Sequence, residues 1–269
     1  MLALTSAVLL AACGGNNDSQ PTPAPAPVPE ETRPQDARVF TAPVATTFAA
    51  MAPATGDVVD VATTSRWAGV LGGAAYRVEV PANWNGKLVM YAHGYAGTGA
   101  PLVVSNPLIR RYLIQNGYAW AASSYSKNYY DVRAGIEDTN ALALEFNNIA
   151  AANMRPLTVP TKRYITGVSM GGQITAAAIE AETAATAVHK VSYAGAVPMC
   201  GVLGDTELFN EFAAMQVTAQ ALAGVPNYPT DKFAEINTLV TNTLFTTFPS
   251  VPTATGVKYL SVVKNITGG

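Results

Sequence analysis

Residues 162–181 read Lys-Arg-Tyr-Ile-Thr-Gly-Val-Ser-Met-Gly-Gly-Gln-Ile-Thr-Ala-Ala-Ala-Ile-Glu-Ala, and this stretch decides the fold. Residues 162–166 end in Tyr-Ile-Thr, which are aromatic or β-branched, and this predicts a buried strand. The residues from Gln173 onward are good helix formers, which predicts a helix. Between them lies a Gly-x-Ser-x-Gly pattern centred on Ser169. A strand, a sharp turn and a helix together predict a nucleophile elbow that exposes the serine hydroxyl.

The glycines at 167 and 171 have a physical reason to flank Ser169. In so tight a turn, a side chain two residues before or after the serine would collide with neighbouring backbone. The serine also precedes a helix, whose first N–H groups favour negative charge developing nearby. We therefore predict Ser169 as a nucleophile, with a glycine-rich turn holding a chance serine as the alternative.

Composition narrows the classes of function. The chain has 269 residues, which suits one α/β domain, and a net charge of −2 with no basic patch. We therefore expect no nucleic-acid partner, and a membrane association only through a lipid. Two cysteines and two histidines favour neither a zinc site nor a disulfide framework. We expect no metal and no cofactor.

The N-terminal region predicts export. Residues 1–12 are apolar but too few to span a bilayer, which is typical of a secretory signal. The sequence Leu-Ala-Ala-Cys ending at Cys13 resembles the lipobox of bacterial lipoproteins, in which the cysteine is acylated. We expect a signal over 1–13, lipidation at Cys13, and a protein anchored to the cell envelope or secreted. An ordinary export signal with an incidental cysteine is the alternative.

The rest of the chain divides by composition into four parts. Residues 14–38 are rich in alternating proline and predict a disordered tether. We predict an α/β core over 39–204, a helical lid-like insertion over 205–255, and the start of a further core element over 256–269. Expected strands are 57–63, 75–81, 87–92, 118–125 and 190–197, and expected helices are 102–116, 135–152, 206–224 and 231–247. Their alternation predicts a mostly parallel sheet with helices on both faces.

Three motifs carry a resemblance to a known family. Residues 84–86 read Trp-Asn-Gly, residues 93–95 read His-Gly-Tyr, and residues 167–172 read Gly-Val-Ser-Met-Gly-Gly. Together they resemble the α/β-hydrolase superfamily, in particular secreted bacterial esterases and prolyl-oligopeptidase-like hydrolases. The resemblance implies hydrolysis of small or polymeric carboxylic esters through an acyl-enzyme. A peptidase of the prolyl-oligopeptidase type is an alternative, although residues 14–80 are too short for its usual propeller.

The resemblance also implies roles for the loop that begins at His93. The backbone N–H groups of Tyr95 and Met170 would form the oxyanion hole, where each donor contributes a few kcal/mol to the transition state. His93 and Gly94 would order this loop rather than transfer protons. The tyrosines at 125, 129 and 130 lie at or just after the end of the strand at 118–125 and are predicted to line an aromatic substrate cleft, with simple packing as the alternative.

The remaining members of a catalytic triad are harder to place. A triad needs a histidine and an acid, which this family places after the serine. The only later histidine is His189, which an elbow helix of about 16 residues would carry roughly 24 Å away. Asp205 is a candidate acid, although a helix start explains it equally well. We therefore expect the histidine and acid beyond Gly269, and a fold that is incomplete at its C-terminus.

Two further interpretations stay open from the sequence. Cys200 could have a disulfide partner further along the chain, or could be a small buried apolar residue. The absence of an evident base leaves a catalytically inactive scaffold that acts as a surface binding protein. The oligomeric state is open.

Overall fold

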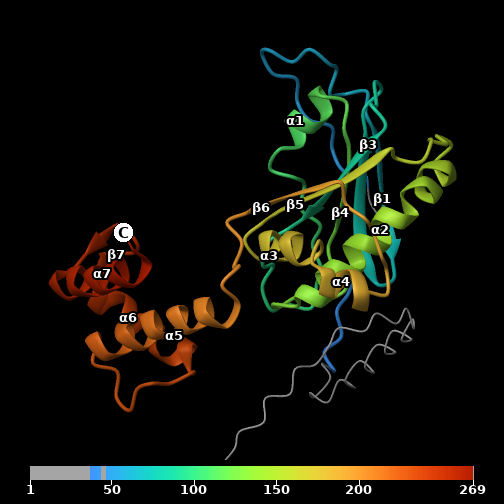
Figure 1. The fold of residues 1–269 in the computed structure, drawn as a ribbon. Helices are drawn as coiled ribbons and strands as arrows, with labels where there is room; N and C mark the ends of the chain where they lie inside the picture. The colour runs from blue at the N-terminus through green and yellow to red at the C-terminus, as the bar shows by residue number, and fades with distance from the viewer. Residues whose placement is uncertain (1–36, 44–46, 269) are drawn as a thin grey trace, which may run out of the picture. The chain divides into compact units, whose positions relative to one another are not determined.

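The computed structural model describes residues 37–43 and 47–268. The predicted signal, Cys13 and most of the predicted tether lie outside the described residues, as does the side chain of Asp205. The described part contains a six-stranded sheet with its covering helices, followed by a helical region with one small two-stranded sheet (Figure 1). Among these residues, no helix has the length and apolar character needed to cross a bilayer.

The main sheet is mixed, with a parallel half and an antiparallel half. Its strand order is β1-β2-β4-β3-β5-β6. The pairs β3/β4, β3/β5 and β5/β6 are parallel, whereas β1/β2 and β2/β4 are antiparallel. The strands are β1 (Ser65–Leu71), β2 (Ala74–Val80), β3 (Lys87–Ala92), β4 (Ala119–Ser123), β5 (Lys162–Val168) and β6 (Gly195–Met199).

Helices cover both faces of this sheet, as the sequence predicts. On one face, α2 and α3 bury Phe146 and Ile174 against Leu88, Met90 and Ile165. On the other face, α1 buries side chains of its own against those of β3 and β4, namely Leu113, Ile114, Val89, Tyr91 and Trp120. The helices of this part are α1 (Arg110–Gln115), α2 (Val132–Ala152), α3 (Met170–Ala177) and α4 (Ala181–Thr186).

The three tryptophans of the chain all lie in this part. Trp67 packs in the same buried cluster as Phe146 and Ile174, and Trp120 packs in the cluster that contains Leu113 and Ile114. Trp84 packs on Phe146 with a distance of 5.9 Å between the ring centres. The indole N–H of Trp120 donates to Glu79 Oε2 at 2.8 Å. Glu79 is fully buried and also accepts from the hydroxyl of Thr64 and from the guanidinium of Arg110. Four donors thus compensate the burial of one carboxylate.

The parallel register brings the ends of β3, β5 and β6 to one edge. Ala92 of β3 lies opposite Gly167 of β5, and Val168 lies opposite Met199 of β6. The loop after β3 and the turn after β5 therefore emerge side by side. In open α/β sheets, the carboxyl ends of the strands are where ligands bind.

The structure corrects two predicted elements before β4. Residues 57–63 form no strand, because the side chain of Gln115 accepts from the N–H groups of Val58 and Val59. The first strand is β1, which turns through Gly72 and Gly73, both with positive φ, into β2. The helix predicted over 102–116 is confined to α1, because Pro101 and Pro107 disfavour helical backbone ahead of it.

Two further predictions change after the elbow. The single predicted helix is divided into α3 and α4, with a break over 178–180. The strand predicted over 190–197 begins only at Gly195, because the preceding segment is attached to α2 instead. There, the amide of Asn140 donates to the His189 carbonyl, and the hydroxyl of Tyr193 donates to Asn140 Oδ1.

The helical region contains α5 (Asp205–Leu222), α6 (Phe233–Leu244), β7 (Phe245–Thr247), β8 (Val251–Pro252) and α7 (Ala254–Thr267). Its buried cluster is small and consists of Ala219, Leu244 and Phe245, with Tyr259 packed against it. The segment expected to begin a further core element over 256–269 is helical through Thr267, and α7 packs with α5 and α6.

Candidate active site

Ser169 lies at the point where β5 ends and α3 begins. Its backbone has φ 59° and ψ −124°. This conformation is strongly unfavourable for any residue other than glycine. The residue is exposed to solvent. Its N–H donates to the Met199 carbonyl at 3.0 Å, and its own carbonyl accepts from Gly172 N–H at 2.8 Å. The strained turn is therefore held from both sides, and the hydroxyl is presented at the edge of the sheet.

The flanking glycines are required by close backbone contacts. A Cβ at Gly171 would collide with the carbonyl of Ala92, and a Cβ at Gly167 would lie 2.6 Å from the same oxygen. Gly172, which the sequence analysis did not single out, would place a Cβ 2.8 Å from Gly201 Cα. The β5–α3 turn thus packs on β3 and on the segment after β6 without room for a methyl group.

The loop after β3 approaches Ser169 directly. A Cβ at Gly94 would lie 3.3 Å from Ser169 Cβ and 3.9 Å from Ser169 Oγ. Tyr95 follows at once and is about half exposed. Among the described residues, the backbone N–H groups of Tyr95 and Met170 have no hydrogen-bond partner. Both unpaired N–H groups thus belong to residues that directly follow Ser169 or its neighbour Gly94.

His93 supports this loop from beneath. It is 4% exposed, and its Nδ1 lies 2.6 Å from the Gly94 carbonyl, so Nδ1 carries the proton in this contact. Its ring stacks on Tyr125 at 4.1 Å, and the Tyr125 hydroxyl donates to the His93 carbonyl at 2.9 Å. Burial lowers the pKa of the imidazole, although the carbonyls of Gly94 and Ser124 oppose this shift. The lowered pKa favours the neutral imidazole, which packs against the backbone of its own loop and the ring of Tyr125.

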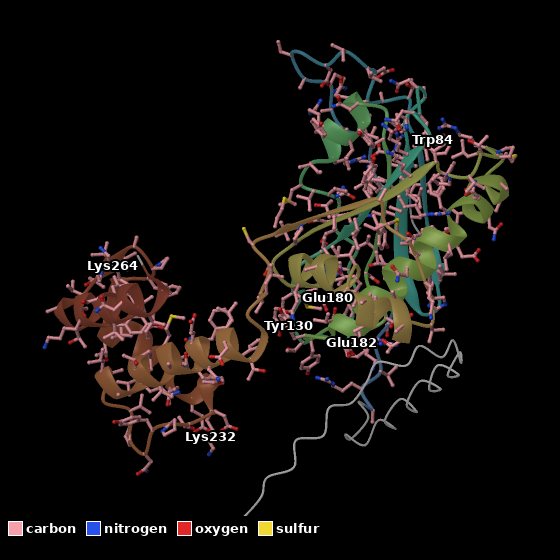
Figure 2. All side chains as sticks on the ribbon, viewed as in Figure 1. Trp84, Tyr130, Glu180, Glu182, Lys232 and Lys264 are labelled. Atoms are coloured by element: carbon pink, nitrogen blue, oxygen red, sulfur yellow. The ribbon has the colours of Figure 1, made fainter. Side chains whose placement is uncertain are left out.

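The predicted cleft tyrosines have three different environments. Tyr125 is 1% exposed and packs under His93, so it does not line a cleft. Burial raises its pKa well above the usual value. Tyr129 has a positive φ of 67° and lies under a guanidinium described below. Tyr130, labelled in Figure 2, donates to Gln173 Oε1 at 2.6 Å and contacts the Phe209 ring edge-on at 5.3 Å. Tyr130 is thus hydrogen-bonded to a residue of the elbow helix.

His189 is attached to α2. Its Nδ1 lies 3.3 Å from Glu137 Oε2, and its N–H donates to the same oxygen at 2.9 Å. Burial alone would raise the pKa of Glu137, but the N–H groups of His189 and Val188 and the charge of Arg133 lower it overall. Among the described residues, neither histidine is hydrogen-bonded to the Ser169 hydroxyl.

Two other features complete the description of the site. Cys200, which follows β6, is exposed and is a free thiol with a positive φ of 48°. A cavity of about 1240 Å³ lies among α5, α6 and α7 and is lined by Phe212, Phe233 and Leu244, but not by Ser169. Within the described ranges, no cluster of histidine, cysteine or carboxylate side chains could hold a metal ion.

Comparisons with known proteins give partial structural likenesses. No protein-family model and no curated protein matches the sequence. The chain is similar in structure to a bacterial brefeldin A esterase that is a homologue of human hormone sensitive lipase, with 18% identity over 48% of this chain and 37% of that one and a TM-score of 0.32. It is also similar to the rice cell wall degrading esterase LipA from Xanthomonas oryzae, with 15% identity over 64% and 48% of the two chains and a TM-score of 0.36.

A third likeness is to esterase B from Lactobacillus rhamnosis, with 16% identity over 71% of this chain and 52% of that one and a TM-score of 0.34. The chain therefore spans about half or less of the length of these proteins. The strand order, the parallel half of the sheet and the strained serine between β5 and α3 are the features of the α/β-hydrolase fold.

Proposed function

We propose that this chain, which has the α/β-hydrolase fold, is a serine hydrolase that cleaves carboxylic esters through an acyl-enzyme. One observation carries the proposal: an exposed serine on a strained turn lies next to Gly94 of the loop after β3, and the backbone N–H groups of the following residues, Met170 and Tyr95, have no partner among the described residues. Backbone strain of this kind persists only where the surrounding structure fixes it, and it is concentrated at functional sites. Tyr95 and Met170 supply the two donors.

In the proposed reaction, Ser169 Oγ attacks the ester carbonyl carbon and its proton passes to a general base. The carbonyl oxygen becomes an oxyanion, which accepts from the N–H groups of Tyr95 and Met170. The C–O bond to the leaving alcohol then breaks, and the alcohol takes the proton. Water attacks the acyl-enzyme by the same route and releases the acid. Among the described residues, neither His93 nor His189 is hydrogen-bonded to Ser169, so the general base is not assigned to either of them.

The aromatic side chains near the elbow support an aryl or polymeric ester as substrate. Tyr130 contacts Gln173 of α3, and Phe209 extends the row of rings beyond Tyr130. Aromatic rings offer large apolar area and prefer to pack edge-on against other rings. A substrate with an aromatic group adjacent to the ester would therefore bind better than an alkyl ester of equal size.

A fluorophosphonate probe tests the nucleophile. We expect labelling of the wild-type protein at Ser169, found by peptide mass spectrometry, and its complete loss in Ser169→Ala. Ser261→Ala, which changes an exposed serine of α7, is the matched control and should label like the wild type. Labelling at another residue, or equal labelling of Ser169→Ala, would contradict the proposal.

A second candidate function is a binding scaffold without catalysis. It is favoured by the lack of a hydrogen bond between Ser169 and either histidine within the described ranges. The same probe distinguishes the two functions, because a serine without activation reacts slowly with phosphonates. A folded wild-type protein that stays unlabelled would favour the scaffold.

A further inference from the structure

The described chain begins with a segment that lies against the loop carrying Tyr95. We call residues 38–43 the N-terminal strap and residues 93–101 the oxyanion loop. Thr41 N–H donates to the Ala100 carbonyl at 3.0 Å, and Leu102 N–H donates to the Thr41 carbonyl at 3.0 Å. The two bonds form a parallel bridge between Thr41 and Pro101. The strap is therefore attached to the far end of the oxyanion loop.

A second segment holds the same loop from another side. Asn128, which is 3% exposed, donates from its amide to the carbonyls of Gly99 and Pro101 at 2.6 and 2.9 Å. Tyr129 N–H donates to the Gly97 carbonyl at 2.9 Å. The carbonyls of Gly97, Gly99 and Pro101 thus accept hydrogen bonds from Asn128 and Tyr129. These bonds fix the path of the oxyanion loop from Gly97 onward.

This second segment is itself attached to the core. Ser126 N–H donates to Asp138 Oδ2 of α2 at 2.6 Å, and Asp131 caps α2 by accepting from Ala134 N–H at 2.8 Å. The residues that grip the oxyanion loop therefore follow the position of α2, which is packed on the sheet. They form the rigid side of the arrangement.

The strap closes the arrangement by contacting this second segment. The guanidinium of Arg38 lies over the ring of Tyr129, 3.3 Å from its centre, and the ring of Phe40 meets Tyr129 edge-on at 6.3 Å. A guanidinium over an aromatic face contributes about 0.5–2 kcal/mol. The strap, the oxyanion loop and the Asn128–Tyr129 segment thus contact one another pairwise, and Tyr129 is the residue that all three share.

We infer that the N-terminal strap positions the oxyanion hole, with Arg38, Phe40 and Thr41 acting as positioning residues. The inference rests on the proposed function for its catalytic consequence. Gly94 is pressed against Ser169 at one end of the loop, and the strap holds the other end near Pro101. Tyr95 lies between Gly94 and Gly97, whose carbonyl accepts from Tyr129 N–H, and the strap packs on Tyr129 through Arg38 and Phe40. The direction of the Tyr95 N–H therefore depends on the strap through Tyr129. Releasing the strap would leave the serine in place and misplace one donor.

Amide hydrogen exchange and probe labelling test this inference on the full chain. Thr41→Pro removes the donor to Ala100, and Arg38→Ala removes the cation above Tyr129 in a variant that leaves the backbone unchanged. We expect amides of residues 94–101 to exchange roughly tenfold faster in both variants, with β3 and β5 unaffected. Fluorophosphonate labelling of Ser169 should slow roughly tenfold, and ester hydrolysis should lose kcat while KM stays the same. Val39→Ala, which changes an 82% exposed neighbour, is the matched control.

The two measurements separate the possible failures. Unchanged exchange over 94–101 in both variants overturns the inference. Faster exchange with undiminished labelling overturns the link to the oxyanion hole. If the wild-type protein is not labelled at all, the proposed function fails, and the exchange measurement alone then decides whether the strap fixes the loop.

Discussion

The sheet part and the helical region of this protein hold their residues in different ways. In the sheet part, large side chains such as Leu88, Trp120 and Ile165 are fully buried on two faces. In α5–α7 the buried cluster is small, while Phe209, Phe212, Phe233 and Phe248 are 40–65% exposed. The difference shows that the strained backbone of Ser169 lies in the part of the protein where dense packing restrains the neighbouring residues. A region with few buried contacts opens at low free energy and could not hold it.

The largest expected loss of stability follows from removing the buried carboxylate of Glu79 from the sheet part. Glu79→Ala leaves Arg110 and the Trp120 N–H buried without their acceptor, and should cost about 4 kcal/mol of unfolding free energy. Denaturant unfolding measures this loss. Glu182→Ala, at an exposed position of α4, is the control and should change stability by less than about 0.5 kcal/mol. A similar small loss for both variants would mean that Glu79 is not structurally important.

Two glycines sharpen the comparison between the regions. A Cβ at Gly171 would collide with Ala92 of the sheet, and a Cβ at Gly256 would collide with the Leu244 carbonyl in the helical region. Each alanine variant should cost about 3 kcal/mol. Hydrogen exchange should locate the loss in β3 and β5 for Gly171→Ala and in α6 and α7 for Gly256→Ala. Gly99→Ala, whose Cβ would have ordinary contacts, should leave the unfolding free energy unchanged. If either clashing variant loses protection evenly over both regions, the two regions do not unfold separately.

The strain at Ser169 predicts different stabilities for two replacements of this residue. Ser169→Gly relieves the unfavourable φ and should be about 1–2 kcal/mol more stable than Ser169→Ala, which keeps it. Both variants lose the nucleophile and should not be labelled. Thermal unfolding of the pair gives the difference, and equal stability would show that the turn is not strained.

The smallest effect concerns pH and the buried His93. Because the fold lowers its pKa below the unfolded value of about 6.5, the unfolded chain binds the proton more readily. Stability should therefore decrease as the pH falls below about 6.5, and this contribution should level off below the folded pKa. The slope should diminish in His93→Gln, as measured by denaturant unfolding at a series of pH values. An unchanged slope in His93→Gln would contradict this prediction.

The elbow could be predicted from sequence because its physics is local. A strand pattern, glycines at 167 and 171 and a helix pattern specify one sharp turn, and the structure has that turn. The fold class follows from the alternation of strands and helices. The strand β1 was not predicted, because its signal is the Gly72–Gly73 hairpin turn rather than an apolar alternation.

The surroundings of the site depend on contacts between distant residues, which no local pattern records. Tyr125 was expected in a cleft, but it packs under His93, 32 positions away. The interaction of Arg38 with Tyr129 joins residues 91 positions apart in sequence. The division of the elbow helix into α3 and α4 likewise reflects the attachment of the following segment to α2.

The location of the three tryptophans has a practical consequence. All of them lie in the sheet part, and Trp120 donates its indole N–H to a buried carboxylate. Tryptophan fluorescence therefore monitors unfolding of the sheet part and does not detect unfolding of α5–α7. Far-ultraviolet circular dichroism detects both regions, so a transition visible in dichroism but silent in emission would be the signature of the helical region melting alone.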